Sequence, residues 1–313
     1  MADIPARIRI ATRESRLAMR QTEMVGEALR ARHPGLAVEA VGMTTKGDRV
    51  LDRPLAQVGG KGLFVKELEV ALDEGRADIA VHSLKDVPMV LAPQFALATF
   101  GPREDPHDAF VSNRHASLES MPAGALVGTS SLRRESQLRR AFPRLRLRAL
   151  RGNVNTRLAK LDSGEYDAII LAAAGLRRLG LEPRIRATLP EALALPAICQ
   201  GILAVEYRRE RADIAALLAP FEDAATAHAA RAERAFGLVV EGSCEVPLGG
   251  IAHATGRSLA LEGFIALPDG TRFVRDRVEG EAAEAEALGA SLGRRLLEAG
   301  GREILDLLSR RSA

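Results

Sequence analysis

The segment that decides the fold is residues 77–88, Ala77-Asp78-Ile79-Ala80-Val81-His82-Ser83-Leu84-Lys85-Asp86-Val87-Pro88. Its first five residues are mostly apolar, which is typical of a short buried strand. Pro88 prevents a helix from running through the polar turn that follows. In open α/β sheets, ligands bind where a turn follows the carboxyl end of a strand. Because this turn carries Ser83, Lys85 and Asp86, it is a candidate site. The alternative is an ordinary turn in which Asp86 only accepts hydrogen bonds from local backbone N–H groups.

Two further strands are expected to end in basic turns. Residues 125–128 lead into Thr129-Ser130-Ser131-Leu132-Arg133-Arg134, and residues 168–171 lead into Ala174-Gly175-Leu176-Arg177-Arg178. A helix that begins after such a strand points its backbone N–H groups at an anion. Arginine suits carboxylates because its planar guanidinium pairs with them bidentately. If the strand ends face one another, the turns line a site for several carboxylates. The basic residues at or near them are Arg13, Arg133, Arg134, Arg151, Arg157 and Arg178.

The first residues of the chain predict a βαβ unit. Residues 8–11 alternate as a strand, and Ser15 is a candidate N-cap for the helix that follows. Residues 36–43 then return as a second strand. A βαβ unit implies a parallel sheet with a right-handed crossover.

Two stretches have the composition of domain boundaries, residues 99–106 and residues 220–223. Beyond the second boundary, residues 258–278 are expected to form a small sheet with a turn at Pro268-Asp269-Gly270. Two amphipathic helices are expected to close this last part of the chain.

The overall composition is that of an ordinary globular protein, with 313 residues, 47% apolar and 27% charged. This length predicts two or three domains. No apolar run is long enough to cross a bilayer, and residues 1–7 carry no signal segment, so we expect a cytoplasmic protein without a membrane partner. The two cysteines, Cys199 and Cys244, indicate neither a disulfide framework nor a cysteine-rich zinc site.

Positive charge is concentrated between Arg133 and Arg157, although the net charge of the chain is only +3. This stretch holds nine arginines and a single acid, Glu135, so it is expected to bind an anion. Nucleic acid is one candidate. Against it, Phe142 is the sole aromatic residue in the stretch, which leaves few platforms for stacking bases. A solvated basic helix face is the other alternative.

Two segments have small residues at positions that suggest function. Residues 44–62 include Gly59-Gly60-Lys61-Gly62, and we expect a mobile loop or lid there. A phosphate-binding loop is the alternative, but the full P-loop spacing is absent. Cys244 follows Gly242-Ser243 and is expected to be accessible, either for a covalent role or as an ordinary turn thiol.

Six segments taken together resemble the porphobilinogen deaminase family, also called hydroxymethylbilane synthases. They occur in the family's order and span nearly the whole chain. The segments are Ala11-Thr12-Arg13, Gly59-Gly60-Lys61-Gly62-Leu63-Phe64, His82-Ser83-Leu84-Lys85-Asp86-Val87-Pro88, Gly128-Thr129-Ser130-Ser131-Leu132-Arg133-Arg134, Arg151-Gly152-Asn153-Val154 and Glu241-Gly242-Ser243-Cys244.

The resemblance implies an α/β fold of two periplasmic-binding-protein-like, doubly wound domains with crossover connections, and a small C-terminal α/β domain. The domains would be residues 1–101 with 200–219, residues 102–199, and residues 220–313. It also implies a transferase of tetrapyrrole biosynthesis. Such an enzyme joins four porphobilinogen units head to tail with loss of ammonia, and water then releases hydroxymethylbilane. The partners would be porphobilinogen and the growing oligopyrrole, without nucleic acid, and the protein would be a monomer.

The family's residues transfer to this chain position by position. The resemblance implies a dipyrromethane cofactor attached by a thioether to Cys244, Asp86 as the catalytic carboxylate, and no metal. The residues that would bind the cofactor are Arg133, Arg134, Ser83, Lys85, Thr129, Ser131, Arg151 and Arg157. The residues that would bind the substrate are Arg13, Arg178, Gln200, Lys61 and Phe64, of which the last two would belong to the loop over the site.

The chemistry independently requires these residue types. Loss of ammonia from the aminomethyl pyrrole leaves a cationic azafulvene, which a fixed carboxylate stabilises where water is excluded. The same carboxylate can relay a proton. Each pyrrole ring brings two carboxylates, so a growing chain needs many arginines. A thiolate supplies the nucleophilic anchor that keeps the product chain attached.

The chain departs from the family at two positions. Cys199 stands where the family usually has glycine, which adds a second conceivable anchor. Glu245 stands where a neutral residue is more usual. A carboxylate beside Cys244 should disfavour the thiolate and slow attachment of the cofactor.

Two other functions compete with the enzyme. A solute-binding or effector-sensing module with the same fold would explain the anion site, but it gives no role to Asp86 or Cys244. A nucleic-acid binder would use the stretch from Arg133 to Arg157, and its affinity would fall steeply with salt.

Overall fold

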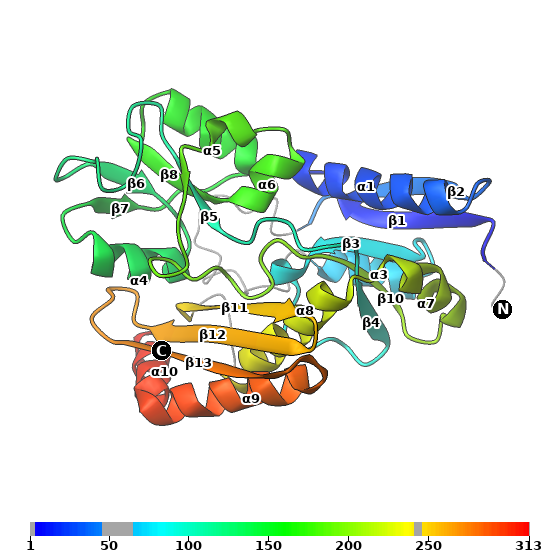
Figure 1. The fold of residues 1–313 in the computed structure, drawn as a ribbon. Coiled ribbons are helices and arrows are strands. Elements are labelled where there is room, and N and C mark those ends of the chain that lie inside the picture. The colour runs from blue at the N-terminus through cyan, green and yellow to red at the C-terminus, as the bar shows by residue number, and fades with distance from the viewer. Residues whose placement is uncertain (1–3, 46–64, 241–245, 313) are drawn as a thin grey trace. The chain divides into compact units, whose positions relative to one another are not determined.

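Three sheets are the framework of the chain in its computed structural model, which describes residues 4–45, 65–240 and 246–312 (Figure 1). The chain divides into two compact units. The first consists of Met1–Glu104 and Ile202–Ala227, and the second of Asp105–Gly201 and His228–Ala313. The division into three domains stays a prediction.

The first unit is built on a five-stranded sheet in the order β2-β1-β3-β10-β4. β1 is parallel to β2 and to β3, as the βαβ pattern predicts, whereas β10 returns antiparallel between β3 and β4. The strands are β1 (Arg7–Arg13), β2 (Ala37–Met43), β3 (Ile79–Ser83), β4 (Phe95–Thr99) and β10 (Leu203–Arg208).

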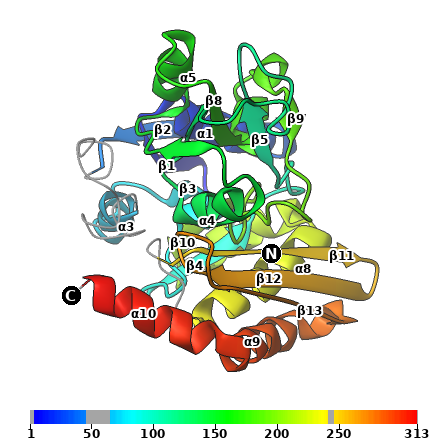
Figure 2. The same cartoon turned by 90° about the vertical axis from the view of Figure 1, so that its left-hand side faces the viewer.

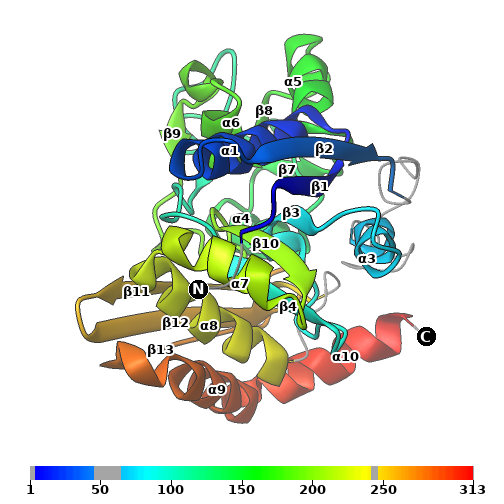
Figure 3. The same ribbon diagram turned by 90° about the vertical axis from the view of Figure 1, so that its right-hand side faces the viewer.

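Helices cover both faces of this sheet because its strands are apolar on both sides. Ile8 and Ile10 of β1 pack in one cluster with α1 and α7, while Ala11 packs in another with α3. The bounds are α1 (Arg16–Arg32), α3 (Lys66–Asp73) and α7 (Ala212–Leu218), and α1 runs beside β1 and β2 in Figure 3.

The start of α1 confirms a simple sequence signal. The Ser15 hydroxyl accepts the N–H of Ala18 at 3.3 Å, so Ser15 is the N-cap of α1 as predicted. Gly75, with φ +66°, follows the end of α3 in the left-handed conformation that glycine adopts without strain.

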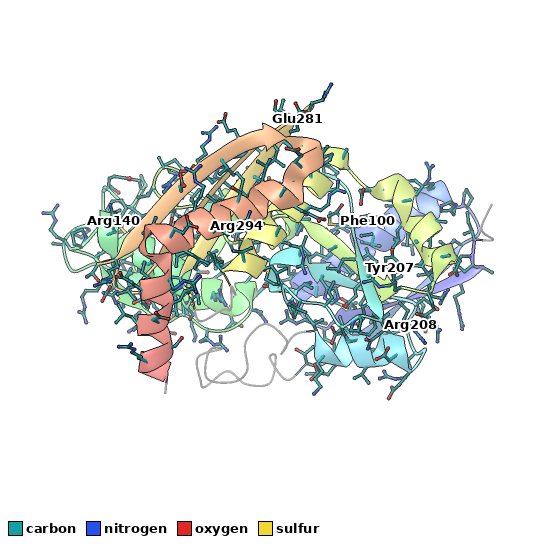
Figure 4. The ribbon with its side chains drawn as sticks, turned by 90° about the horizontal axis from the view of Figure 1, so that it is seen from below. Phe100, Arg140, Tyr207, Arg208, Glu281 and Arg294 are labelled. Atoms are coloured by element: carbon teal, nitrogen blue, oxygen red, sulfur yellow. The ribbon has the colours of Figure 1, made fainter. Side chains whose placement is uncertain are left out.

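An aromatic pair also stabilises the first unit. The ring of Phe100, labelled in Figure 4, stacks on Phe221 with centroids 4.8 Å apart. Phe221 ends the short 3₁₀ helix η5 (Ala219–Phe221).

The second unit contains a five-stranded sheet in the order β7-β6-β8-β5-β9. β6 is parallel to β7 and β8, and β5 runs antiparallel to β8. The pattern resembles that of the first unit, where β10 lies antiparallel beside β3, but here the antiparallel strand is β5, the earliest strand of this sheet in the sequence. The strands are β5 (Asp108–Val111), β6 (Leu126–Gly128), β7 (Arg146–Arg148), β8 (Ala168–Ala172) and β9 (Ala187–Thr188).

Two apolar clusters lie on the two faces of this sheet. Ile169 and Leu171 of β8 pack against α5, and Ile170 packs in a separate cluster with Leu138 of α4. The helices are α4 (Leu132–Ala141), α5 (Val154–Asp162), α6 (Ala173–Arg178) and the short η4 (Glu182–Arg184). The doubly wound α/β class is therefore confirmed, together with the strands that were predicted before the three polar turns.

A three-stranded antiparallel sheet, β11-β12-β13, forms the last part of the second unit. Figure 2 shows α9 below β13. A Cβ built at Gly280 of β13 would lie 2.9 Å from Leu288 of α9, and one at Gly263 of β12 would lie 3.1 Å from Leu292. The elements are β11 (Leu248–Thr255), β12 (Ser258–Ala266), β13 (Phe273–Glu281), α8 (Ala224–Val239), η6 (Ala282–Glu284), α9 (Ala285–Leu296), the π-helical η7 (Leu297–Gly301) and α10 (Arg302–Ser312).

The sequence missed β11 because two of its residues, Gly249 and Gly250, weaken a strand signal. The fold requires them, since a Cβ at Gly249 would lie 2.7 Å from the carbonyl oxygen of Pro196. The predicted turn between β12 and β13 is confirmed. There Arg140 of α4, labelled in Figure 4, lies over the ring of Phe273, with 4.9 Å from its Cζ to the centroid.

Candidate active site

The polar turn after β3 is a single 3₁₀ turn, η3 (Leu84–Asp86), which the chain fixes in place from both ends. Leu84 is buried, and its N–H donates to the carbonyl of Ile202 at 3.0 Å. The N–H of Val87, also buried, closes the turn on the carbonyl of Leu84. The half-buried carboxylate of Asp86 therefore stands on a rigid support.

Asp86 lines a pocket of about 60 Å³ in the first unit. The predicted residues Arg13 and Ser83 line the same pocket, so the structure brings these three together. Lys85 is half-buried in the same turn but does not line this pocket. The pocket is lined by Arg13, Ser15, Leu17, Ala18, Gln21, Val65, Val81, His82, Ser83 and Asp86.

Gln21 and His82 are pocket residues to which sequence reasoning gave no role. The amide nitrogen of Gln21 donates to the Ser83 hydroxyl at 2.8 Å, which joins α1 to the end of β3. Only the helical spacing from Ser15 could have placed Gln21 near the site, and that signal does not distinguish it from a surface glutamine. His82 directly precedes Ser83 in the sequence motif.

In the second unit, Arg133 and Arg134 at the start of α4 are almost fully buried and share one carboxylate, Asp108 of β5. Arg133 donates to both carboxylate oxygens, at 2.8 and 3.1 Å, and Arg134 donates to Oδ1 at 2.7 Å. The amide of Gln200 also donates to Oδ1, at 2.9 Å. Asp108 is thus a site residue that the sequence did not reveal, because no local spacing links it to the arginines.

The electrostatics of this cluster follow from two cations meeting one anion. Burial alone would raise the pKa of Asp108, but the charges of Arg133 and Arg134 hold it far below its ordinary value of 3.8. Burial lowers the pKa of Arg133 from its ordinary 12.5, and Asp108 opposes that change. Within the described residues, the Nε atoms of both arginines lack a hydrogen-bond partner. The trio keeps a net positive charge, which fits a further anionic group.

The remaining predicted anion-binding residues lie at the turns where they were expected. Ser131 caps α4 by accepting the N–H of Arg134, and its own N–H donates to the Thr129 hydroxyl at 3.3 Å. Arg157 donates from Nε to the carbonyl of Gly152 at 2.8 Å, which ties α5 to the turn before it.

Two further arginines complete this set. Arg178, at the end of α6, donates to the carbonyl of Gly201 at 2.6 Å. Arg151 is half-buried, and burial lowers its pKa from 12.5. Both arginines therefore lie partly out of water, where a guanidinium interacts more strongly with a carboxylate.

Three predicted residues, Lys61, Phe64 and Cys244, lie outside the described residues. The alternative anchor, Cys199, is described and is fully buried, which argues against it as a nucleophile for a bulky group. Its φ is +60°, in the left-handed region, which explains why glycine suits this position. The first unit thus holds a carboxylate pocket, and the second unit holds a buried arginine cluster.

Comparison with protein families covers nearly the whole chain. The model described as "Porphobilinogen deaminase, dipyromethane cofactor binding domain" matches residues 8–216, and the model of the porphobilinogen deaminase C-terminal domain matches residues 227–298. The chain belongs to the porphobilinogen deaminase family. Membership confirms the family resemblance seen in the sequence motifs, and the name of the first domain confirms dipyrromethane as the cofactor.

Full-length relatives give the same family. A porphobilinogen deaminase of Thiobacillus denitrificans is 56% identical over 299 residues, covering 96% of this chain and 98% of its own. One from Burkholderia thailandensis is 57% identical over 315 residues, covering 100% of this chain and 96% of its own. Among solved structures, the methionine-binding protein MetQ aligns over 69% of this chain and 90% of its own, with 14% identity and a TM-score of 0.45.

The arginine cluster fits the cofactor of this family. Two pyrrole rings with two carboxylates each form a polyanion, and the cluster around Asp108 carries excess positive charge with two buried Nε atoms that no described residue satisfies.

None of the described helices has the length and apolar character of a membrane span. The described residues also contain no cluster of His, Cys, Asp and Glu that could hold a metal ion.

Proposed function

We propose that Asp86 is the catalytic carboxylate of the porphobilinogen deaminase reaction in this chain, and that Cys244 anchors the dipyrromethane cofactor. The chain is a transferase of tetrapyrrole biosynthesis, as its family is. It joins four porphobilinogen units with loss of ammonia and releases hydroxymethylbilane. When bound, dipyrromethane supplies the pyrrole carbon to which the first substrate unit is joined.

The observation that carries this proposal is the position of Asp86. Its carboxylate lines a pocket at the carboxyl end of β3, beside Arg13 and Ser83, on a turn that Leu84 fixes to the sheet. A rigid carboxylate needs little reorganisation when positive charge develops on the azafulvene, so it stabilises the transition state efficiently. Arg13 in the same pocket suits a carboxylate of the substrate.

The arginines of the second unit are assigned to the acid groups of the pyrrole rings. A buried guanidinium binds a carboxylate strongly because water does not screen the pair. The residues proposed to bind the cofactor are Arg133, Arg134, Ser83, Lys85, Thr129, Ser131, Arg151 and Arg157. The residues proposed to bind the substrate are Arg13, Arg178, Gln200, Lys61 and Phe64.

Intact-protein mass spectrometry tests the anchor. The purified protein should carry an excess mass of two pyrrole units, and Cys244→Ser should abolish it. Cys199→Ser is the matched control and should keep the excess mass, because the buried Cys199 thiol is not the proposed nucleophile. An excess mass that survives in Cys244→Ser would contradict the proposal.

Turnover tests the carboxylate. Asp86→Asn should keep the fold and lower kcat at least about 100-fold, because the neutral amide cannot stabilise the cation. Asp73→Asn, at the exposed end of α3, is the control and should retain the rate of the unmodified chain. A rate in Asp86→Asn that equals that of the control would remove Asp86 from the mechanism.

We also propose that the protein is a cytoplasmic monomer with three domains, at residues 1–101 with 200–219, 102–199 and 220–313. The proposed thioether supports a cytoplasmic location, because a reducing compartment keeps the anchoring thiol free to form it. Light scattering after gel filtration should give a mass near 33.5 kDa, and a mass near twice that value would contradict a monomer.

A further inference from the structure

A buried histidine–glutamate pair lies directly behind the turn that carries Asp86. His82 is on β3 and Glu206 is on the neighbouring antiparallel strand β10, where Glu206 pairs in register with Ala80. Nε2 of His82 lies 2.9 Å from Oε2 of Glu206. Their side chains are 5% and 0% exposed. Since the pair joins two central strands, it fixes the imidazole at the end of β3.

Burying this pair in the core of a sheet costs free energy of folding. A fully buried carboxylate loses its hydration, and the Oε1 atom of Glu206 has no hydrogen-bond partner within the described residues. Two apolar side chains in these positions would pack without that penalty. Packing alone therefore does not explain the pair. Its position beside the Asp86 pocket indicates a role in the site.

His82 lines the same 60 Å³ pocket as Asp86. Val65, at the start of α3, lines it too, so the pocket reaches the face of the sheet that α3 covers. Because Nε2 lies 2.9 Å from the Glu206 carboxylate, which can only accept a hydrogen bond when ionised, Nδ1 is the ring nitrogen with which His82 can accept one. The other titratable and charged groups that face the pair are Glu69 of α3, whose pKa is raised by burial and by the charge of Glu206, and Asp86 and Arg13 of the pocket.

We propose that His82, oriented by Glu206, forms the site for the aminomethyl nitrogen of the substrate, which arrives as a primary ammonium, separates from carbon as ammonia and departs as ammonium. This inference rests on the proposed function. An ammonium group needs acceptors. The two that the proposal assigns are the Asp86 carboxylate and Nδ1 of His82, both residues of this pocket, with Nε2 of His82 held by Glu206.

The proton balance of the reaction gives His82 its task. The C–N bond breaks with its electron pair on nitrogen, which yields ammonia and the cationic azafulvene. The α-carbon of the acceptor pyrrole then forms the new C–C bond, and its hydrogen leaves as a proton. Nδ1 of His82 takes that proton and passes it to ammonia, which departs as ammonium. Asp86 thereby stays ionised beside the cation for the whole step, and the charges of reactants and products balance.

Added ammonium chloride is the direct probe of this site. Ammonium is the product that leaves the pocket, so it should inhibit the cofactor-loaded chain at constant ionic strength, with sodium chloride as the reference salt. His82→Ala should lower kcat at least about 100-fold and lose most of the inhibition by ammonium. His107→Asn, in the second unit, is the matched histidine control and should keep both properties.

A second variant guards against a purely structural effect. Glu206→Gln keeps the size of the side chain but removes its charge, so it should lower kcat and weaken inhibition by ammonium in the same direction. In the double variant the two losses should not add, because His82 acts through its contact with Glu206.

Three outcomes decide the matter. A folded, cofactor-loaded His82→Ala chain with unchanged kcat would overturn the inference, and so would a lower kcat with full inhibition by ammonium. If His82→Ala fails to fold, unchanged inhibition in Glu206→Gln would overturn it. Failure of the proposed function is distinguishable, since the unmodified chain itself would then release no hydroxymethylbilane.

Discussion

Single residues decide whether a buried charge in this molecule is paired, and Asp108 is the clearest example. The sequence identified Arg133 and Arg134 from a basic turn, but it gave no reason to single out an acid at position 108. The structure places that acid between both guanidiniums, at 2.8 and 2.7 Å, with its side chain 0% exposed. Both arginines can therefore stay charged in the interior. Two guanidiniums and one carboxylate still leave a net positive charge for an anionic ligand.

Removing the charge of Asp108 should destabilise the fold severely. Asp108→Asn leaves two buried guanidiniums without their anion, and we expect a loss of about 3–5 kcal/mol in the free energy of unfolding, measured by urea denaturation. Glu135→Gln is the control, on helix α4 that also carries Arg133 and Arg134. Its ion pair with Arg139 is partly exposed, and its loss should lower the free energy of unfolding by less than about 1 kcal/mol. Equal losses in the two variants would contradict this account of the cluster.

Cys199 allows a second test at the scale of one residue. Its φ of +60° disfavours every side chain with a Cβ, and the residue is fully buried. Cys199→Ala and Cys199→Gly both remove the thiol, so they differ only by one Cβ methyl group at this left-handed position. The glycine variant should be the more stable by about 0.5–1 kcal/mol, because relief of left-handed strain exceeds the entropy that glycine gains on unfolding. A more stable alanine variant would mean that the backbone is not strained there.

Helices and strands are the scale at which the sequence was most informative. Each strand before a polar turn was predicted because its signal is local, an apolar run that ends in polar residues. The pairing of those strands was not predictable, since β10 reaches its place between β3 and β4 from more than a hundred residues away. Separation along the sequence also hid Gln21 and Asp108, whose partners Ser83 and Arg133 lie on other elements, 62 and 25 residues away. Cofactor roles were assigned through the family motifs, and they stay predictions.

The N-terminus of α5 tests whether a cap matters for an arginine-bearing helix. Asn153 accepts the N–H of Thr156 at 3.0 Å and its hydroxyl at 3.1 Å. Asn153→Ala removes both bonds and should lower the free energy of unfolding by about 1 kcal/mol, measured by chemical denaturation. Asn153→Asp can accept the same bonds and should stay within a few tenths of a kcal/mol of the unmodified chain. Equal losses in the two variants would show that side-chain capping does not stabilise this helix.

At the scale of the whole molecule, the chain's many charges make stability depend on pH, and one network in the second unit should respond at both ends of the pH range. Glu191 accepts from His253 of β11 at 2.8 Å and lies 3.5 Å from His107, whose other ring nitrogen lies 2.7 Å from Asp105. Around it, Arg177 pairs with Asp105 at 3.2 Å, and Arg275 donates to the backbone carbonyl of Glu191. The network joins the β11 strand to the segment before β5.

The two ends of the pH range should weaken this network for different reasons. Hydrogen bonds from His107 and His253 lower the pKa of Glu191 to about 2, so its stabilisation is complete above 4.5 and is lost as pH falls toward 2. Glu191 and Asp105 raise the pKa of His107 above 6.5, although burial opposes them. Its stabilisation is complete below 6.5 and is lost as pH rises through the raised value. Both contributions coexist between 4.5 and 6.5.

Glu191→Gln should therefore lower Tm most between pH 4.5 and 6.5, and the difference from the unmodified chain should shrink toward pH 2 and above the titration of His107. The reason is that the stabilisation by the Glu191 anion is complete only above pH 4.5, while its partner His107 loses its charge as pH rises above 6.5. Glu279→Gln, in an exposed pair with Arg277, is the control and should give a small difference that does not peak there. Thermal melts at closely spaced pH values would reveal the peak. A constant difference across the range would mean that Glu191 contributes through packing and neutral hydrogen bonds, independently of the charge on His107.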